Sequence, residues 1–256
     1  MSATPATPAP ASQATYAQRV AFVCEMAARL HRYGTTAQRL EAAIVALSQQ
    51  LVLDCEPWSN PTGLILSFSD PTKAIGSSDI TRIIRLGPGD NDLHKLAAAD
   101  RIAESVANGL MSIAQGHTAL RQLDQPMRRR DKVFTAISFG LTSAAVAGLW
   151  RLPWLDIGTA GVIGVLIGGL TLFSDRSVAT REASEALSAL LAGFVAVLVA
   201  AFIGPLNLNS VIIASLVVLL PGLMLTNAVN ELSSQHWVSG TARFAGALTI
   251  VLKLTV

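Results

Sequence analysis

The sequence has 256 residues, of which 51% are hydrophobic and 14% charged, and 19 Lys and Arg against 17 Asp and Glu give a formal net charge of +2. So small a net charge, carried by scattered basic residues, argues against a nucleic-acid-binding protein. Only ten charged residues follow Lys132, so charge is concentrated in the first half of the chain. This length and division predict one soluble domain followed by a membrane domain.

The soluble part is predicted to follow a disordered tail at residues 1–15, which is rich in Pro, Ala, Ser and Thr and has no secretory-signal pattern. Apolar residues at helical spacing predict a helix from Tyr16 to Tyr33 that stops at Gly34. A second helix follows, and Thr35 with Gln38 has the spacing of a capping box at its start.

Two strands, 63–69 and 80–86, are predicted on either side of the turn-rich DPTKAIGSSD. A long helix from about 91 to 114 then leads through Gly116 into a shorter one. These elements, in the order α, α, β, β, α, α, form a predicted cytosolic α+β domain at 16–130.

The remainder, 131–256, is predicted to be a membrane domain because it contains long apolar segments. A hydrocarbon core of ~30 Å needs about 17–25 residues per helix. The last segment carries Arg243 and Lys253 near its two ends, so it spans only if both reach the interfaces. We therefore predict an α-helical polytopic membrane protein with about five transmembrane helices, at 133–150, 157–173, 187–203, 208–226 and about 240–256.

Basic residues flanking these segments predict the orientation. With the N-terminal domain in the cytosol, seven basic flanking residues lie inside and only Arg151 and Lys253 outside. The second segment also repeats small residues every fourth position, which favours close helix packing, or alternatively a glycine-lined path. Asp156 at its start is interpreted as a helix N-cap. The small residues are Ala160, Gly164 and Gly168.

Most of the candidate site lies where the fourth predicted span is broken and in the segment that follows. Pro221, followed by Gly222, leaves the Val217 carbonyl without its helical donor, so a neighbouring helix or a polar cavity is expected to satisfy it. Asn227, Asn230 and Glu231 then fall at helical spacing on one face. They are candidates for binding a polar solute or a coupling proton, or they are simply the cytosolic end of the helix.

Three further charged residues complete the predicted substrate site. Asp175 and Arg176 end the second segment and form either an inner gate or a solvated loop. Arg243, at the start of a weakly apolar helix, is expected to meet Glu231 or an anionic substrate. We predict no catalytic residue, metal or cofactor, because Cys24 and His31 are about 10.5 Å apart on their helix and the other histidines lack metal-ligand spacing.

The sequence resembles the bacterial threonine/serine exporter family, in the half that carries a cytosolic domain followed by five transmembrane helices. The resemblance rests on RYGTTAQRLE, TGLILSFSD, the Asp175–Arg176 pair and PG...N..EL...SG..R. Its residues are Gly34, Arg39, Glu41, Thr62, Gly63, Pro221, Gly222, Asn230, Glu231, Leu232, Ser239, Gly240 and Arg243.

The resemblance implies export of threonine and serine, or of dicarboxylates such as succinate, across the bacterial inner membrane. It also implies the split form, in which a separate small membrane subunit completes a hetero-oligomeric transporter. Driving by the proton gradient is expected. Two alternatives stay open: a membrane-anchored hydrolase or sensor acting through the soluble domain, and a scaffold that stabilises a transporting partner.

Overall fold

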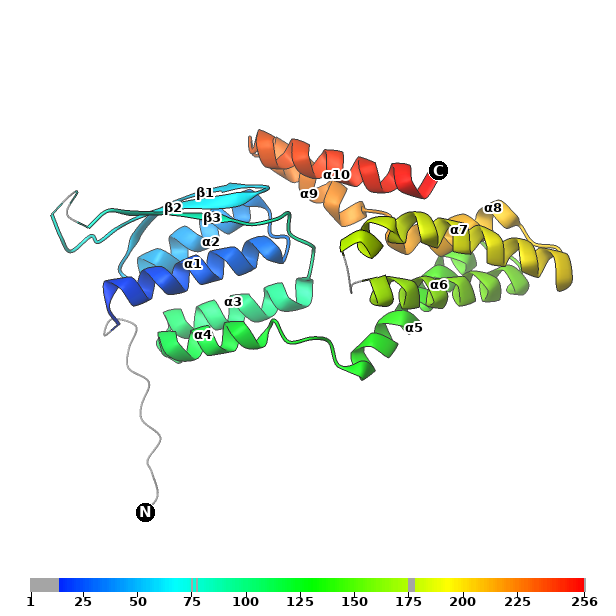
Figure 1. Cartoon of the computed structure of the whole chain (residues 1–256), viewed down its shortest axis with the longest axis horizontal. Coiled ribbons are helices and arrows are strands. Elements are labelled where there is room, and N and C mark those ends of the chain that lie inside the picture. Colours follow the sequence, from blue (N-terminus) through cyan, green and yellow to red (C-terminus); the bar gives the residue numbers. More distant parts are fainter. Residues whose placement is uncertain (1–13, 75, 77, 175–177, 256) are drawn as a thin grey trace, which may run out of the picture. The chain divides into compact units, whose positions relative to one another are not determined.

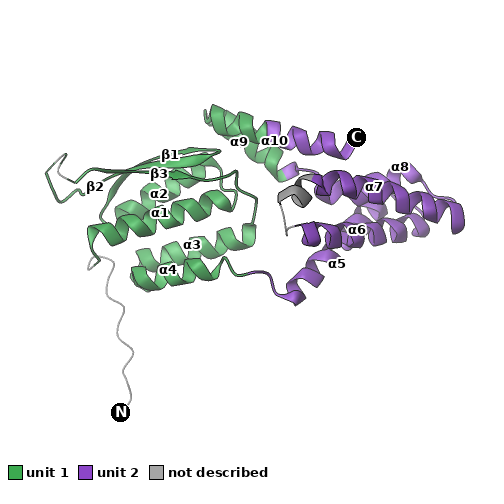
Figure 2. Cartoon of the chain, in the orientation of Figure 1, with its two compact units in different colours: residues 1–125, 223–244 green, residues 126–222, 245–256 purple. Residues whose placement is uncertain are grey.

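The computed structural model describes residues 14–74, 76, 78–174 and 178–255 (Figure 1). The chain divides into two compact units (Figure 2). Unit 1 comprises Met1–Gln125 with Leu223–Phe244, and unit 2 comprises Pro126–Gly222 with Ala245–Val256. A segment from the predicted membrane half, Leu223–Phe244, therefore groups by its contacts with the N-terminal part of the chain.

Unit 1 is built around an antiparallel sheet with the strand order β1-β2-β3. Its strands are β1 (Asp54–Asn60), β2 (Gly63–Ser69) and β3 (Ile80–Arg85). Its helices are α1 (Tyr16–Arg32), α2 (Ala37–Gln50), α3 (Leu93–Ala107), α4 (Ile113–Gln122), most of α9 (Gly222–Ser233) and the start of α10 (Trp237–Thr255).

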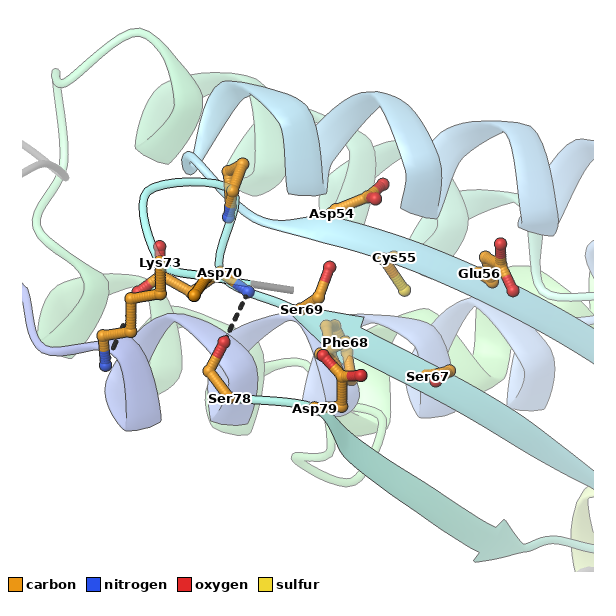
Figure 3. Close-up of a pocket in the computed structure, with 12 residues that line it drawn as sticks. Asp54, Cys55, Glu56, Ser67, Phe68, Ser69, Asp70, Lys73, Ser78 and Asp79 are labelled. Carbon is orange, nitrogen blue, oxygen red and sulfur yellow. Dashed lines mark hydrogen bonds and ion pairs between the residues drawn. The ribbon is translucent and has the colours of Figure 1, made fainter. Parts of the chain in front are cut away.

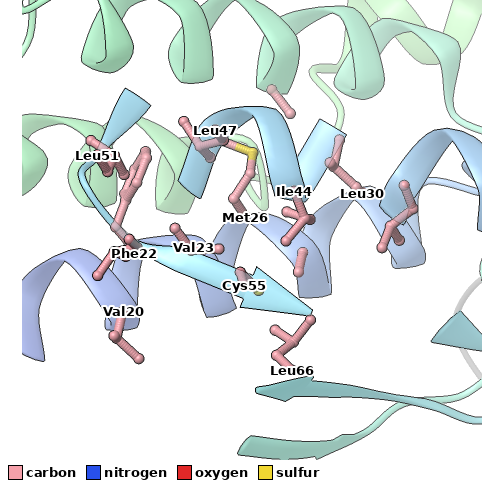
Figure 4. Packing of buried hydrophobic residues seen from close by; sticks show 14 of the residues in the cluster. Val20, Phe22, Val23, Met26, Leu30, Ile44, Leu47, Leu51, Cys55 and Leu66 are labelled. Carbon is pink, nitrogen blue, oxygen red and sulfur yellow. The ribbon is translucent and has the colours of Figure 1, made fainter. Parts of the chain in front are cut away.

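The hydrophobic core of unit 1 lies between one face of this sheet and helices α1 and α2 (Figure 4). Phe22 and Met26 from α1, Ile44 from α2 and Leu66 from β2 all belong to this cluster, and each is at most 1% exposed. Burying a side chain of this kind stabilises the fold by about 1.5–3 kcal/mol. This core holds the α1–α2 corner in place, where the candidate site lies.

The prediction of the strands at 63–69 and 80–86 is confirmed to within one residue, but the sequence analysis missed β1. Pro57 interrupts the strand pattern and lacks a backbone donor, which restricts it to an edge strand. β1 is such a strand, because it pairs with β2 alone. The element order is therefore α, α, β, β, β, α, α before residue 125.

The turn between α1 and α2 differs from the prediction in one respect. Gly34 follows the helix end as expected, with φ of 80°, and the Gly34 and Thr35 amides donate to the His31 and Leu30 carbonyls, as in a Schellman motif. The capping box predicted at Thr35 is wrong. Thr36 is the N-cap of α2, and its side chain makes no capping bond.

The long helix predicted from 91 to 114 is also wrong, since α3 ends at Ala107 and α4 starts at Ile113. Gly109 between them has φ of 71°, a conformation that terminates a helix. Gly116 lies inside α4, where it packs against Phe22. Its role is thus close helix packing rather than a break.

Unit 2 consists of helices and connecting loops, with no strand among its described residues. Its helices are α5 (Arg129–Leu149), α6 (Trp154–Ser174), α7 (Val178–Phe202), α8 (Leu208–Leu216), the short η2 (Val217–Leu219) and the end of α10. Three stretches are long and apolar enough to cross a membrane: all of α5, all of α6, and Ala183–Phe202 of α7. The stretch Leu208–Leu219 with α9 meets the same criterion only if the two parts count as one broken span.

The described residues thus contain three candidate spans, or four with the broken pair, and α10 is not among them. The structure therefore supports a mostly helical chain with a small sheet and three or four candidate spans, fewer than the five predicted. The fourth predicted span corresponds to α8, η2 and the first part of α9.

Close packing of α5 on α6 accounts for the small residues in the second predicted span. A Cβ atom at Gly164 would lie 2.8 Å from the Phe139 carbonyl oxygen, and one at Gly168 would lie 2.9 Å from Ala136 Cα. Ala160 is fully buried in the same unit. Backbones approach this closely only where side chains are small, so ordinary helix packing explains the repeat.

The backbone itself satisfies the carbonyl that Pro221 was expected to leave unpaired. The Leu220 amide donates to the Val217 carbonyl at 3.1 Å, which closes the η2 turn. Leu220 is then extended, with φ of −65° and ψ of 131°, as is usual before proline. The expectation that a neighbouring helix or polar cavity satisfies this carbonyl is therefore wrong.

Two glycines that follow helices provide a matched test of this fold. Replacing Gly34 or Gly109 by Ala forces a Cβ into a left-handed conformation, which costs about 1–2 kcal/mol. At Gly34 the added Cβ would also lie 2.9 Å from Asn91 Cα, whereas at Gly109 nothing lies within 4 Å. We expect Gly34→Ala to lower the free energy of unfolding clearly more than Gly109→Ala, measured by denaturant titration of the full chain in detergent. Equal losses would contradict this packing.

Candidate functional site

A buried ion pair joins α9 to α10 within unit 1. Glu231 is fully buried, and Arg243 Nε and Nη2 donate to its two carboxylate oxygens at 3.0 and 3.1 Å. Two parallel bonds of this kind fix the guanidinium and the carboxylate in one plane. The contact predicted between Arg243 and Glu231 is therefore present.

The same carboxylate also holds the first turn of α2. The Ala37 amide donates to Glu231 Oε1 at 2.9 Å, across 194 residues of sequence. Ala37 is the first residue of α2, where the amides have no partner within the helix and a negative charge is favourable. Glu231 thus supplies the cap that the Thr36 side chain does not, and Arg243 Nη2 also approaches the Thr35 carbonyl at 3.5 Å.

A second polar contact lies one turn further along α2. His236, in the turn between α9 and α10, places Nε2 3.1 Å from Glu41 Oε2, and the Ser59 amide donates to Glu41 Oε1 at 2.8 Å. His236 Nδ1 lies 3.0 Å from the Ser234 carbonyl oxygen. Glu41 therefore connects α2, β1 and the α9–α10 turn.

The α9–α10 turn is itself tightly packed. A Cβ atom at Gly240 would lie 2.7 Å from Leu232 Cγ, and Ser239 beside it is buried. The turn also borders a cavity of about 310 Å³, lined among others by Glu41, Trp58 and Trp237. Both tryptophans are more than half exposed, so this cavity opens to the surface.

The other predicted site residues are not gathered around Glu231. The Asn227 side chain donates to Asn91 Oδ1 at 3.4 Å, and Asn230 is exposed on α9. Pro221 and Gly222 lie at the break that precedes α9. Asp175 and Arg176 lie outside the described residues.

The two thiols are poor candidates for catalysis. Burial raises the pKa of Cys24 and of Cys55 to about 11, so almost none of either thiolate is present at neutral pH. His31 contacts the Gly87 carbonyl oxygen through Nε2, and burial lowers its pKa. No thiol–imidazole dyad is formed by Cys24 in the part of the chain that the structure describes.

A further polar pocket, of about 380 Å³, lies where β1 and β2 meet the loop after β2 (Figure 3). Hydrogen bonds from the Thr72 hydroxyl and amide lower the pKa of Asp70, and the Asp70 amide donates to Ser78 Oγ. The remaining carboxylates, Asp54, Glu56 and Asp79, form no metal-binding group with three ligands among the described residues. These bonds explain the loop conformation and assign no ligand.

The chain matches the family model described as "Putative threonine/serine exporter" (ThrE) over residues 21–256. The chain belongs to this family. The match covers both the N-terminal α+β elements and the apolar helices, so the ThrE likeness applies to nearly the whole chain. No solved structure matches it.

Fungal membrane proteins are also similar to the chain. "Pheromone-regulated membrane protein 10" of Debaryomyces hansenii is 25% identical over 244 residues, covering 92% of this chain and 23% of the relative. The Candida albicans protein of the same name is 27% identical, covering 93% and 21%, and that of Saccharomyces cerevisiae is 24% identical, covering 93% and 31%. The chain thus spans about a quarter of the length of these relatives.

Sequence motifs that suggested the ThrE resemblance meet in space within unit 1. The segment RYGTTAQRLE contributes Glu41 and the start of α2, and PG...N..EL...SG..R contributes Glu231 and Arg243. Sequence analysis missed the Ala37 amide and His236 as partners. The only signal available for these contacts was that Glu41 and Glu231 both lie in the quoted motifs.

A pair of arginine substitutions tests the energetic weight of this site. Arg243→Ala leaves the Glu231 charge buried with no cation, and we expect a loss of about 3–5 kcal/mol in the free energy of unfolding. The matched control is Arg39→Ala, which removes the exposed ion pair with Asp100 and should cost less than about 1 kcal/mol. The measurement is denaturant unfolding of the full chain in detergent. Similar losses for both variants would refute the assigned role of Arg243.

Proposed function

We propose that this protein is a subunit of a secondary exporter that carries small hydrophilic metabolites out of a bacterial cell across the inner membrane. Threonine and serine are the first candidates, and dicarboxylates such as succinate are the second. The proposal is carried by the ThrE match over residues 21–256 in a chain whose described helices include three candidate spans.

In the proposed orientation, the N-terminal α+β elements face the cytosol. This is supported by the basic run from Arg128 to Lys132 at the start of α5, and by the further basic residues on the same side of the predicted spans. Glu231 and Arg243, on the α9–α10 hairpin of the same unit as those elements, then belong to the cytosolic end of the transport path.

The proposed substrate residues are Pro221, Gly222, Asn227, Asn230, Glu231 and Arg243, with Asp175 and Arg176 as an inner gate. Glu231 and Arg243 neutralise each other in this conformation. An amino-acid zwitterion carries both of the charges needed to replace them, its ammonium facing Glu231 and its carboxylate facing Arg243. A dicarboxylate offers a partner to Arg243 alone, so this chemistry favours threonine or serine.

A second membrane subunit and the proton gradient complete the proposal. Unit 2 contains an apolar groove of about 950 Å³, lined by residues of α7, α8 and α10 that include Leu190, Phe194 and Leu252. In the proposed hetero-oligomer the partner helices cover this groove. Export against a concentration gradient then draws on proton entry.

Asn230 provides the sharpest test of the substrate path, because its side chain is exposed on α9. In vesicles containing the chain and its partner, loaded with radiolabelled threonine, serine or succinate, we expect Asn230→Ala to lower efflux about tenfold, the effect of losing one hydrogen bond to a charged group. A proton uncoupler should abolish efflux against a gradient.

The matched control is Ser233→Ala, another exposed polar residue of α9, whose hydroxyl donates only to the Val229 carbonyl. It should leave efflux unchanged. Unaltered efflux with Asn230→Ala would instead favour a scaffold subunit that assembles but does not contact the solute. Activity retained by a fragment that ends before α5 would favour the anchored hydrolase or sensor.

A further inference from the structure

A buried carboxylate lies at the start of α6 in unit 2. Asp156 is 0% exposed, and the Asn207 side-chain amide donates to its Oδ2 at 2.7 Å, with the Asn207 backbone amide at 3.4 Å. Asn207 is the N-cap of α8, so the contact joins the first turns of two helices. The other oxygen, Oδ1, is buried and has no hydrogen-bond partner.

The two oxygens of Asp156 have different surroundings. Oδ2 accepts the Asn207 side-chain amide, whereas Oδ1 is buried and has no donor. A buried polar atom without a partner is costly. Because α6 starts at Trp154, Asp156 lies within its first turn, and the prediction that it is the N-cap is wrong. Asn207 accounts for Oδ2 and leaves Oδ1 without a partner.

No described charged side chain neutralises Asp156. On α5, the charged residues lie in the first turn, from Arg129 to Lys132, at the far end from the start of α6. On α7, Glu185 lies 3.8 Å from Lys253, and α8 contains no charged residue. Arg151, in the connection between α5 and α6, is exposed and makes no ion pair among the described contacts.

A metal ion is a poor match for this position. Cations such as Ca²⁺ and Mg²⁺ require six or more oxygen ligands, and the described residues contain no group of three or more candidate metal ligands. A proton needs a single oxygen and removes the charge from the carboxylate. The orphaned Oδ1 therefore matches the chemistry of proton binding.

We propose that Asp156 is a proton-binding site of unit 2. A proton from water adds to Oδ1 to give the neutral carboxyl, and it leaves again to water, so no other reactant is consumed. The basic residues of α5 are in its first turn, and α5 ends at Leu149, shortly before α6 begins at Trp154. Asp156, in the first turn of α6, therefore follows the end of α5 that is opposite the basic turn. Resting on the proposed export function and orientation, this places the site at the outer face, where protons enter.

Infrared difference spectroscopy of the full chain in lipid nanodiscs, between acidic and alkaline buffer, tests proton binding without any transport assay. We expect a band of a protonated buried carboxyl that is lost in Asp156→Asn. The matched control is Asp131→Asn, because Asp131 occupies the first turn of α5 but is exposed; it should keep the band. A band that persists in Asp156→Asn would overturn the proposal.

A transport measurement provides the second test. For a solute exchanged with one proton, one pH unit across the membrane supports about a tenfold concentration ratio. Asp156→Asn should lose this tenfold accumulation while it still exchanges solute between equal pools, and an undiminished pH-driven accumulation would contradict the site. No transport by the wild-type chain, together with a carboxyl band at Asp156, would reject the export function and leave proton binding standing.

If Asp156→Asn does not fold, Asn207→Ala gives an independent test. It removes the amide donor to Oδ2 and keeps the carboxyl group. The carboxyl band should shift in frequency because its hydrogen bonding has changed, whereas Asp131→Asn leaves the frequency unaltered. An unshifted band in Asn207→Ala would show that the band arises elsewhere and would overturn the assignment.

Discussion

The arrangement of unit 1 depends on the hydrogen bonds and the ion pair of the Glu231 carboxylate. It is fully buried, and it meets the guanidinium of Arg243 and the first amide of α2 at once. A buried carboxylate is tolerated only when its charge and its lone pairs are both satisfied. Glu231 meets this condition only when α9, α10 and α2 are together, so one side chain fixes three elements.

This dependence gives a physical meaning to the segments that carry the ThrE likeness. They are almost 200 residues apart in sequence, yet they supply the two ends of the Ala37–Glu231 hydrogen bond and of the Glu41–His236 contact. α9 follows the break at Pro221 directly along the chain. The contacts of Glu231 with Ala37 and of His236 with Glu41 therefore link the α+β elements to the segment in which the proposed solute path begins.

Local sequence signals predicted much of the fold and only part of the site. The end of α1 at Gly34 and the strand β2 follow from short-range patterns, and both are present. β1 was missed because Pro57 masks an edge strand, and Thr35 was assigned a capping role that a distant carboxylate performs on Ala37. Contacts of this kind depend on tertiary structure, which spacing along a chain does not encode.

The pairing of Glu231 with Arg243 was foreseen because both are charged and lie on neighbouring apolar helices. The contact of Glu231 with the Ala37 amide was not foreseen, since a backbone amide carries no signature in the sequence. Asp156 shows the same limit. The sequence predicts it as an N-cap, but α6 starts two residues earlier, and only the structure shows that the carboxylate is buried with no partner on Oδ1.

Hydrogen exchange of the Ala37 amide, followed by nuclear magnetic resonance on the full chain, tests the central claim most directly. This amide is the first of α2 and has no partner within its helix, so the Glu231 carboxylate is the acceptor that protects it. The account predicts slow exchange in the native protein and fast exchange in Glu231→Ala, with the amides of α4 unaffected. Fast exchange of Ala37 in the native protein would contradict it.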